Sequence, residues 1–263
     1  MSKVLKFHKM CALGNDFIVI DERKGQCDWQ LGEIQNLCDR RFGIGADQLL
    51  LIRASQIADV KISIYNQDGS QAKQCGNGLR AVAYLFLKEN MHQESITIEV
   101  EGKHYACQRA SKDTISVNLG LPILKPLTYN LAGSQLFEYG IEVDVGNPHL
   151  VLWLKANAPA FDFNTLGQTI QRQYIDGINV HCVKRLAKDK IYVQHWERGT
   201  GVTPSCGSGS IASVFAGIYL GFLTSAVKVE NAVAELEVNV VDNGYVLVGS
   251  VVHVFDGEIR VIR

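Results

Sequence analysis

The sequence predicts an α+β protein with two pseudo-symmetric domains, each a mostly antiparallel or mixed sheet wrapped around a central helix. The segment Cys-Gly-Asn-Gly at 75–78 returns as Cys-Gly-Ser-Gly at 206–209, and an apolar run follows each copy. A second echo pairs Gly14-Asn15 with Gly146-Asn147 at almost the same interval, 131 against 132 residues. Two echoes at one interval indicate an internal duplication. Short alternating apolar segments around both copies favour strands.

The composition bounds the class of protein. A chain of 263 residues suits one large or two ordinary domains, and 47% hydrophobic with 20% charged residues is typical of a globular core. The net charge of −1 argues against nucleic acid or an acidic membrane as a partner. The N-terminus lacks the apolar segment of a signal peptide, and no apolar run is long enough to span a bilayer. We therefore expect a cytoplasmic protein.

Seven cysteines without an export signal do not indicate a disulfide framework. The sequence contains no C-x-x-C motif and no Cys/His cluster at zinc spacing, so no metal site is expected. Five of the cysteines lie among apolar residues and are expected in the core. They are Cys11, Cys27, Cys38, Cys107 and Cys182.

The first half alternates strand signals with turn signals. Apolar residues recur at helical spacing over 31–41, and the glycine-rich segment 42–47 is expected to be a turn. A polar turn at 66–69 leads to Cys75 and its helix. Strands are expected at 4–8, 17–20, 48–52, 60–65, 95–101, 104–109 and 114–118.

The second half repeats this order after Gly120 and Pro122, which mark the passage between halves. The expected domains are 1–118, completed by a C-terminal strand at about 251–263, and 119–250. A helix is expected at 163–172, and another follows Cys206. Strands are expected at 142–145, 150–154, 180–183, 191–196, 227–229, 235–241, 245–255 and 258–262.

The two helices after the cysteines are apolar almost all round, which predicts burial. A cysteine ahead of a helix faces unpaired backbone N–H groups and the positive end of the helix dipole, which favour the thiolate. Such placement can lower the pKa of a cysteine from about 8.5 to roughly 3.5–7.5. Cys75 and Cys206 are therefore the candidate reactive residues.

Two cysteines on opposite sides of one carbon could invert a stereocentre next to a carboxylate without a cofactor. One thiolate would remove the alpha proton, and one thiol would return a proton to the other face. Backbone N–H groups at helix starts bind anions and stabilise developing enolates. We expect the active site in a cleft between the halves, with this role for the backbone of Gly76, Asn77, Gly207 and Ser208.

Several blocks together resemble the signature of the diaminopimelate epimerase family. They follow family order along essentially the whole chain. The blocks are Leu13-Gly14-Asn15-Asp16-Phe17, Gly43-Ile44-Gly45-Ala46-Asp47-Gln48, Asn66-x-Asp68-Gly69-Ser70 with Cys75-Gly76-Asn77-Gly78-x-Arg80, Gly146-Asn147-Pro148-His149, Glu197-Arg198-Gly199 and Cys206-Gly207-Ser208-Gly209.

The resemblance implies interconversion of LL- and meso-diaminopimelate without pyridoxal phosphate or another cofactor, in lysine and peptidoglycan precursor biosynthesis. It implies that Cys75 and Cys206 are the acid/base pair, assisted by His149 and Glu197. It also implies a small-molecule amino-acid substrate and a homodimer. The residues implied in substrate binding are Asn15, Gln48, Asn66, Gly76, Asn77, Asn147, Asn179, Glu197, Arg198, Gly207 and Ser208.

Simpler interpretations exist for single residues. An Asn before Asp-Gly or Pro is often only a turn former, which applies to Asn66 and Asn147. Val202 stands where the family usually has Glu, which leaves a related substrate open. The first alternative is a cofactor-independent racemase of another amino acid on the same scaffold. The second is a non-catalytic redox thiol protein that uses Cys75 and Cys206.

Overall fold

The polypeptide divides into two compact units, each with strands around one long helix. The structure, a computed structural model, describes residues 2–262. Unit 1 is Met1–Asn118 with Gly249–Arg263, and unit 2 is Leu119–Val248. The α+β class predicted from the sequence is confirmed.

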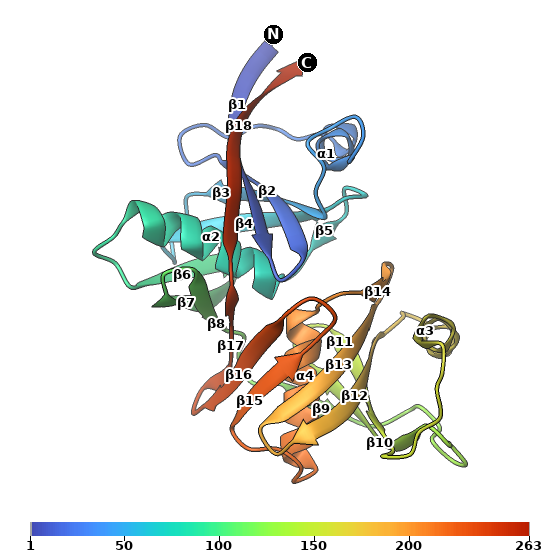
Figure 1. Cartoon of the computed structure of the whole chain (residues 1–263). Helices are drawn as coiled ribbons and strands as arrows, with labels where there is room; N and C mark the ends of the chain where they lie inside the picture. Colours follow the sequence, from blue (N-terminus) through green and yellow to red (C-terminus); the bar gives the residue numbers. More distant parts are fainter. Residues whose placement is uncertain (1, 263) are drawn as a thin grey trace. The chain divides into compact units, whose positions relative to one another are not determined.

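Unit 1 is a mixed sheet whose neighbours run in the order β18, β1, β2, β3, β4, β6, β7, β8. All of these pairs are antiparallel except β2–β3 and β4–β6, and short β5 pairs with β4. Figure 1 shows β1 in blue beside β18 in red, the two terminal strands of the chain. The strands are β1 (Ser2–Ala12), β2 (Asn15–Asp21), β3 (Gln48–Arg53), β4 (Val60–Asn66), β5 (Gln71–Ala72), β6 (Ser95–Val100), β7 (Lys103–Ser111), β8 (Thr114–Asn118) and β18 (Val252–Ile262).

Unit 2 repeats this sheet in the order β9, β10, β11, β12, β13, β15, β16, β17. Its parallel pairs, β11–β12 and β13–β15, lie at the matching places, and short β14 pairs with β13 as β5 does with β4. The strands are β9 (Ile123–Lys125), β10 (Phe137–Asp144), β11 (Pro148–Leu154), β12 (Asn179–Ala187), β13 (Lys190–Glu197), β14 (Gly201–Thr203), β15 (Ala226–Glu230), β16 (Glu235–Val241) and β17 (Gly244–Ser250).

Each sheet holds a long, mostly buried helix that starts directly after a cysteine. These helices are α2 (Gly76–Glu89) in unit 1 and α4 (Gly207–Tyr219) in unit 2. Because both are apolar on most faces, burial against the sheet removes a large apolar area from water. In α4, Gly217 allows Leu223 to pack closely against the helix, since a Cβ at Gly217 would lie 2.4 Å from a methyl carbon of Leu223.

A shorter helix packs on another part of each sheet. These are α1 (Leu31–Cys38) and α3 (Phe163–Gln171). Buried Ile34 and Leu37 join α1 to a cluster around Leu49 and Leu51 of β3. The sequence predicted that the first helix would reach residue 41. It ends at Cys38 because the Asp39 carboxylate accepts hydrogen bonds from the N–H groups of Arg41 and Phe42, which fold the chain into a turn.

The end of the chain differs from the prediction. A strand was expected over 245–255 and another over 258–262, but β17 ends at Ser250 and β18 is continuous from Val252 to Ile262. The break falls at buried Val251, whose N–H donates to the carbonyl of Asp113 in unit 1. Gly257 does not end a strand. It makes room for Phe7, whose ring would lie 2.5 Å from a Cβ at that position.

No helix within residues 2–262 has the length and apolar character needed to cross a bilayer.

Candidate active site

Cys75 is the N-cap of α2. Its backbone is extended, with φ of −151°, and its sulfur accepts a hydrogen bond from the N–H of Gly78 at 3.3 Å. This is the ordinary arrangement of an N-cap side chain, which satisfies one of the helix-start donors. Gly76 and Asn77 form the first turn, where backbone N–H groups have no acceptor within the helix. The predicted position of Cys75 at a helix start is confirmed.

Cys206 has the same local geometry at the start of α4. Its φ is −136°, and the sulfur accepts from the N–H of Gly209 at 3.4 Å. Gly207 and Ser208 form the first turn, and the Ser208 hydroxyl lies 3.6 Å from the sulfur. The two cysteines are therefore presented by equivalent pieces of backbone, one in each unit.

Unit 1 brings Asn15 to Cys75. The Cys75 sulfur lies 3.8 Å from Oδ1 of Asn15, and Nδ2 of Asn15 donates to Asp47 at 2.8 Å. Asp47 therefore fixes which end of the amide faces the cysteine. Gln48 and Asn66 are register partners on β3 and β4, and Nε2 of Gln48 donates to Oδ1 of Asn66 at 2.9 Å. The Oε1 atom of Gln48 is buried without a hydrogen bond in the described part of the chain.

A network of charged residues supports the Asn15 turn. Asp16 accepts two hydrogen bonds from Arg40 and one from Lys9, and Arg40 also bonds Asp47 at 2.8 Å. Burial alone would raise the pKa of Asp16, but the hydrogen bonds from Arg40 and Lys9 outweigh it and hold that pKa far below its usual value. The carboxylate is thus ionised, and the turn that carries Asn15 is tied to the sheet.

Unit 2 gathers the matching residues around β11, β12 and β13. Asn179 donates to the carbonyl of Pro148 at 2.8 Å and accepts from the N–H of Arg198 at 3.0 Å. Oδ1 of Asn147 lies 2.9 Å from Nε2 of His149. The guanidinium of Arg198 donates to the carbonyl of Asp176. Its stem packs on Gly177, where a Cβ would lie 2.8 Å from Cδ of Arg198.

The surroundings of the two sulfurs differ in charge. Cys206 is buried, and burial first and the Glu197 carboxylate second raise its pKa well above the usual value, against smaller opposing effects of Ser208 and Gly209. The sequence predicted one thiolate and one thiol without indicating which cysteine is which. At Cys206, desolvation and a neighbouring carboxylate oppose the helix end and favour the thiol. Glu197 is itself held by the hydroxyl of Thr203 at 2.6 Å.

Near Cys75 the buried charge is positive. Arg80 of α2 is fully buried and donates from Nη2 to Oδ1 of Asn77 at 2.7 Å. Its Nε and Nη1 make no hydrogen bond with the described part of the chain. Burial lowers the pKa of Arg80 to about 10, and electrostatic interactions with Cys75 and Cys107 oppose that fall. The guanidinium therefore stays protonated at neutral pH and places a buried positive charge near Cys75.

Comparison with known proteins gives a consistent result. The sequence profile of diaminopimelate epimerase matches residues 7–124 and 141–254. The chain belongs to the diaminopimelate epimerase family. A diaminopimelate epimerase of Carboxydothermus hydrogenoformans is 36% identical over 97% of this chain and 99% of its own length. That of Clostridium perfringens is 34% identical over 96% of this chain and 98% of its own.

Solved structures share the fold at low identity. A phenazine biosynthesis protein of the PhzF family from Bacillus anthracis aligns with a TM-score of 0.70 at 15% identity, covering 98% of this chain and 99% of that one. A hydroxyproline epimerase from Agrobacterium vitis aligns with a TM-score of 0.69 at 10% identity, covering 98% and 92%. Both structures share the fold of this chain over 98% of its length.

The sequence did not predict a functional role for three buried residues. They are Arg80, His181 and His195, none of which is more than 1% exposed. Arg80 lies in the motif that begins at Cys75, but no role was predicted for it. His181 and His195 lie in alternating strand sequence, where only their inward-facing register could have marked them.

Two groups of metal-ligating side chains lie close together within the described residues. They are His181 with His195 and Cys206, which are buried, and His8 with His253 and Asp256, which are at the surface. The sequence predicted no metal site, and spacing alone could not reveal these groups, because their members come from different strands. His8 and His253 each hydrogen-bond one oxygen of Asp256, at 2.5 and 2.7 Å.

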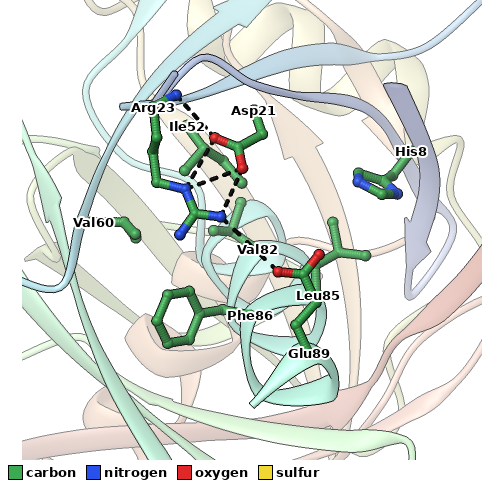
Figure 2. Close-up of a pocket in the computed structure, with 9 residues that line it drawn as sticks. All are labelled: His8, Asp21, Arg23, Ile52, Val60, Val82, Leu85, Phe86 and Glu89. Carbon is green, nitrogen blue, oxygen red and sulfur yellow. Dashed lines mark hydrogen bonds and ion pairs between the residues drawn. The ribbon is translucent and has the colours of Figure 1, made fainter. Parts of the chain in front are cut away.

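A separate depression in unit 1 contains none of the predicted site residues. Figure 2 shows its lining, with Arg23 bound through two nitrogens to the Asp21 carboxylate and 4.0 Å from Glu89. Val82, Leu85 and Phe86 of α2 form its apolar side. These residues lie toward the end of α2 that is remote from Cys75. The hydrogen-bonded ion pair already satisfies the guanidinium, so we assign no ligand to it.

Proposed function

We propose that this protein interconverts LL- and meso-diaminopimelate, with Cys75 and Cys206 acting on opposite sides of one alpha carbon. The single observation that carries the proposal is the pair of equivalent helix-start cysteines in a chain of this family. Relatives that are 34% and 36% identical over nearly the whole chain bear this name, whereas the hydroxyproline epimerase shares only the fold at 10% identity. We therefore assign the substrate from the diaminopimelate epimerases, which are more similar to this chain in sequence than the hydroxyproline epimerase is.

The electrostatic difference between the units supports different roles for the two cysteines. Cys75, near buried Arg80, is the thiolate that takes the alpha proton, and Cys206, near Glu197, is the thiol that gives one. The C–H bond breaks toward the Cys75 sulfur, and the Cys206 S–H bond breaks toward the carbon. After turnover the thiol and thiolate have exchanged sides, so the reverse reaction starts from that state. No cofactor takes part in this scheme.

Anion stabilisation lowers the barrier to proton removal. The alpha C–H group of an amino acid is a very weak acid. As its proton leaves, negative charge develops on the neighbouring carboxylate. First-turn N–H groups at Gly76, Asn77, Gly207 and Ser208 can donate to that charge. Asn15, Gln48 and Asn66 in unit 1, and Asn147, Asn179 and Arg198 in unit 2, would hold the substrate's amino and carboxylate groups. His149 and Glu197 would assist the cysteines.

A deuterium-exchange assay tests the proposal. Purified protein in D₂O is incubated with LL-diaminopimelate, and NMR measures both loss of the alpha proton and appearance of the meso isomer. Both are expected. Exchange with histidine, proline or another mono-amino acid, while diaminopimelate stays untouched, would indicate a different racemase. Absence of exchange with every amino acid would favour the redox-thiol alternative.

A homodimer, implied by the family resemblance, and a cytoplasmic location stay predictions. Sedimentation velocity of the purified chain would test the first, with a mass near twice 29.1 kDa expected.

A further inference from the structure

Three histidines form a buried chain beneath the start of α4. Nδ1 of His149 lies 2.8 Å from Nε2 of His181, and Nδ1 of His181 lies 3.0 Å from Nδ1 of His195. The other end of the chain is Asn147, whose Oδ1 is 2.9 Å from Nε2 of His149. The His181 ring lies directly against Gly209, where a Cβ would lie 2.3 Å from Cε1 of that ring. The chain therefore connects the Cys206 helix start to Asn147.

Unit 1 has apolar residues at the three matching positions. Phe17 is the register partner of Gln48, and Leu50 is the register partner of Ile64. In unit 2 the same places in the ladder belong to His149 opposite Asn179, and to His181 opposite His195. Leu50 faces Gly78 as His181 faces Gly209. All six side chains are buried. An apolar trio is therefore enough for this fold, and the histidines need another reason.

The direction of the hydrogen bonds in this chain follows from the buried nitrogen of His195 that has no partner in the described part of the chain. Nε2 of His195 is buried and has no partner within the described residues. If Nε2 of His149 donates to Asn147, each ring in turn accepts at one nitrogen and donates at the other, and His195 ends with an unpaired acceptor. If Asn147 is turned around, His195 ends with an unpaired N–H. An orphaned buried donor is rarer than an under-used acceptor, so the first direction is favoured.

The chain is neutral at physiological pH. Burial, with charge repulsion from His195 and Arg198, lowers the pKa of His149 to about 3, and burial lowers that of His195 to about 3. Burial likewise lowers the pKa of His181 well below its usual value. Each ring thus carries one N–H and one acceptor, as a directed chain requires.

We infer that His181 and His195 are positioning residues that act through His149 to orient the Asn147 side chain. Because His149 donates to Oδ1, the two hydrogens on Nδ2 of Asn147 are left for an acceptor such as a substrate carboxylate. This inference rests on the proposed function, in which Asn147 holds the substrate. Asn15 of unit 1 is oriented differently, by an acceptor: its Nδ2 donates to Asp47 and its Oδ1 faces Cys75.

NMR of imidazole nitrogens tests the direction of the chain without reference to activity. Long-range ¹H–¹⁵N spectra of the ¹⁵N-labelled protein, assigned with single His→Gln variants, distinguish the two neutral tautomers. His149 and His181 are expected to carry the proton on Nε2, and His195 on Nδ1. A proton on Nδ1 of His149 would reverse the chain and overturn the inference. A proton on Nε2 of His195 would do so as well, as would a change of spectrum on adding EDTA, which would indicate a metal between the rings.

Steady-state kinetics test the consequence for the substrate. The variant His181→Leu/His195→Ile carries the residues that unit 1 has at these places, so its fold is expected to persist. Its KM for diaminopimelate should rise by about 10-fold or more, because an unfixed amide loses part of a hydrogen bond to a charged group, while kcat changes by less than about threefold. His181→Gln, which can still donate and accept, should recover most of the KM.

Two kinetic results would contradict the inference. One is an unchanged KM in the double variant, and the other is a fall in kcat alone. A wild-type protein inactive on diaminopimelate, yet with the expected tautomers, would instead refute the proposed function and leave the orientation of Asn147 intact.

Discussion

The two helix starts have the same backbone and neighbouring charges of opposite sign. Cys75 and Cys206 are both N-caps with extended φ angles and matching bonds from the third helical residue. Five residues further on, however, unit 1 has Arg80 where unit 2 has Ile211. The last residue of β4 is Asn66, whereas its counterpart on β13 is Glu197. The comparison teaches that a duplicated scaffold can position two sulfurs alike while neighbouring side chains surround them with charges of opposite sign.

The largest effect is expected when either sulfur is replaced. Cys75→Ser and Cys206→Ser should each lower epimerisation by about 10³-fold or more, because proton transfer on both faces of the carbon is needed. Activity is measured by isomer separation, and circular dichroism checks that the fold persists. A variant that retains near-normal epimerisation would refute the two-base scheme.

Removing the buried cation Arg80 should lower the reactivity of Cys75 in unit 1. Arg80→Met is expected to lower kcat/KM and the rate of Cys75 alkylation by iodoacetamide at pH 7.5 by about 10-fold each, because the thiolate loses a positive neighbour. Peptide mass mapping measures the alkylation. Stability should change little, since a partly unsatisfied buried charge is replaced by an apolar chain.

The matched control for this variant is Ile211→Met at the corresponding place in unit 2. It should leave alkylation of Cys75 unchanged. In the unaltered protein Cys75 should react well before Cys206, whose pKa is raised by burial and by Glu197. Faster alkylation of Cys206 would contradict the assignment of the thiolate to unit 1.

The histidine trio should make the protein sensitive to acid. The folded pKa of His195 is about 3, below the value of about 6.5 in an unfolded chain, so the unfolded state binds more protons between these values. Stability is therefore full above pH 6.5 and falls as the pH decreases, by about 2 kcal/mol at pH 5 for this residue alone. Urea unfolding of His195→Ile at pH 7.5 and pH 5 should show a smaller loss than the unaltered protein. An equal loss in both proteins would refute the buried, neutral state of His195.

A pair of glycines gives the smallest expected difference. Gly209→Ala places a Cβ 2.3 Å from a His181 ring atom, whereas the nearest atoms to a Cβ at Gly78 are Leu50 methyls at 3.3 Å. The first should cost about 1–3 kcal/mol of unfolding free energy, and the second about 1 kcal/mol or less, because alanine's helix propensity offsets it. In a His181→Leu background, Gly209→Ala should fall to the lower value. Thermal unfolding of the four variants measures this, and equal costs at both glycines would contradict the close packing of His181.

Local sequence signals were sufficient for much of the fold. The repeated Cys-Gly-x-Gly segments and the apolar periodicity predicted both long helices, and glycines mark turns through backbone freedom that needs no distant partner. The prediction failed for 245–255 and 258–262, which were expected as separate strands on either side of Gly257. That glycine serves close packing against Phe7, and nothing in its neighbourhood along the chain reveals this.

By itself, the sequence determined the duplication, the α+β class and the position of one cysteine at each helix start, because these depend on residues adjacent in the chain. Only the tertiary structure decided that Arg80 lies buried near Cys75, that Glu197 and burial keep Cys206 protonated, and that three histidines join Asn147 to the Cys206 helix. Desolvation and charge depend on which strands come together in space. A spacing rule along one chain holds no information on the dielectric surroundings in which a side chain comes to lie.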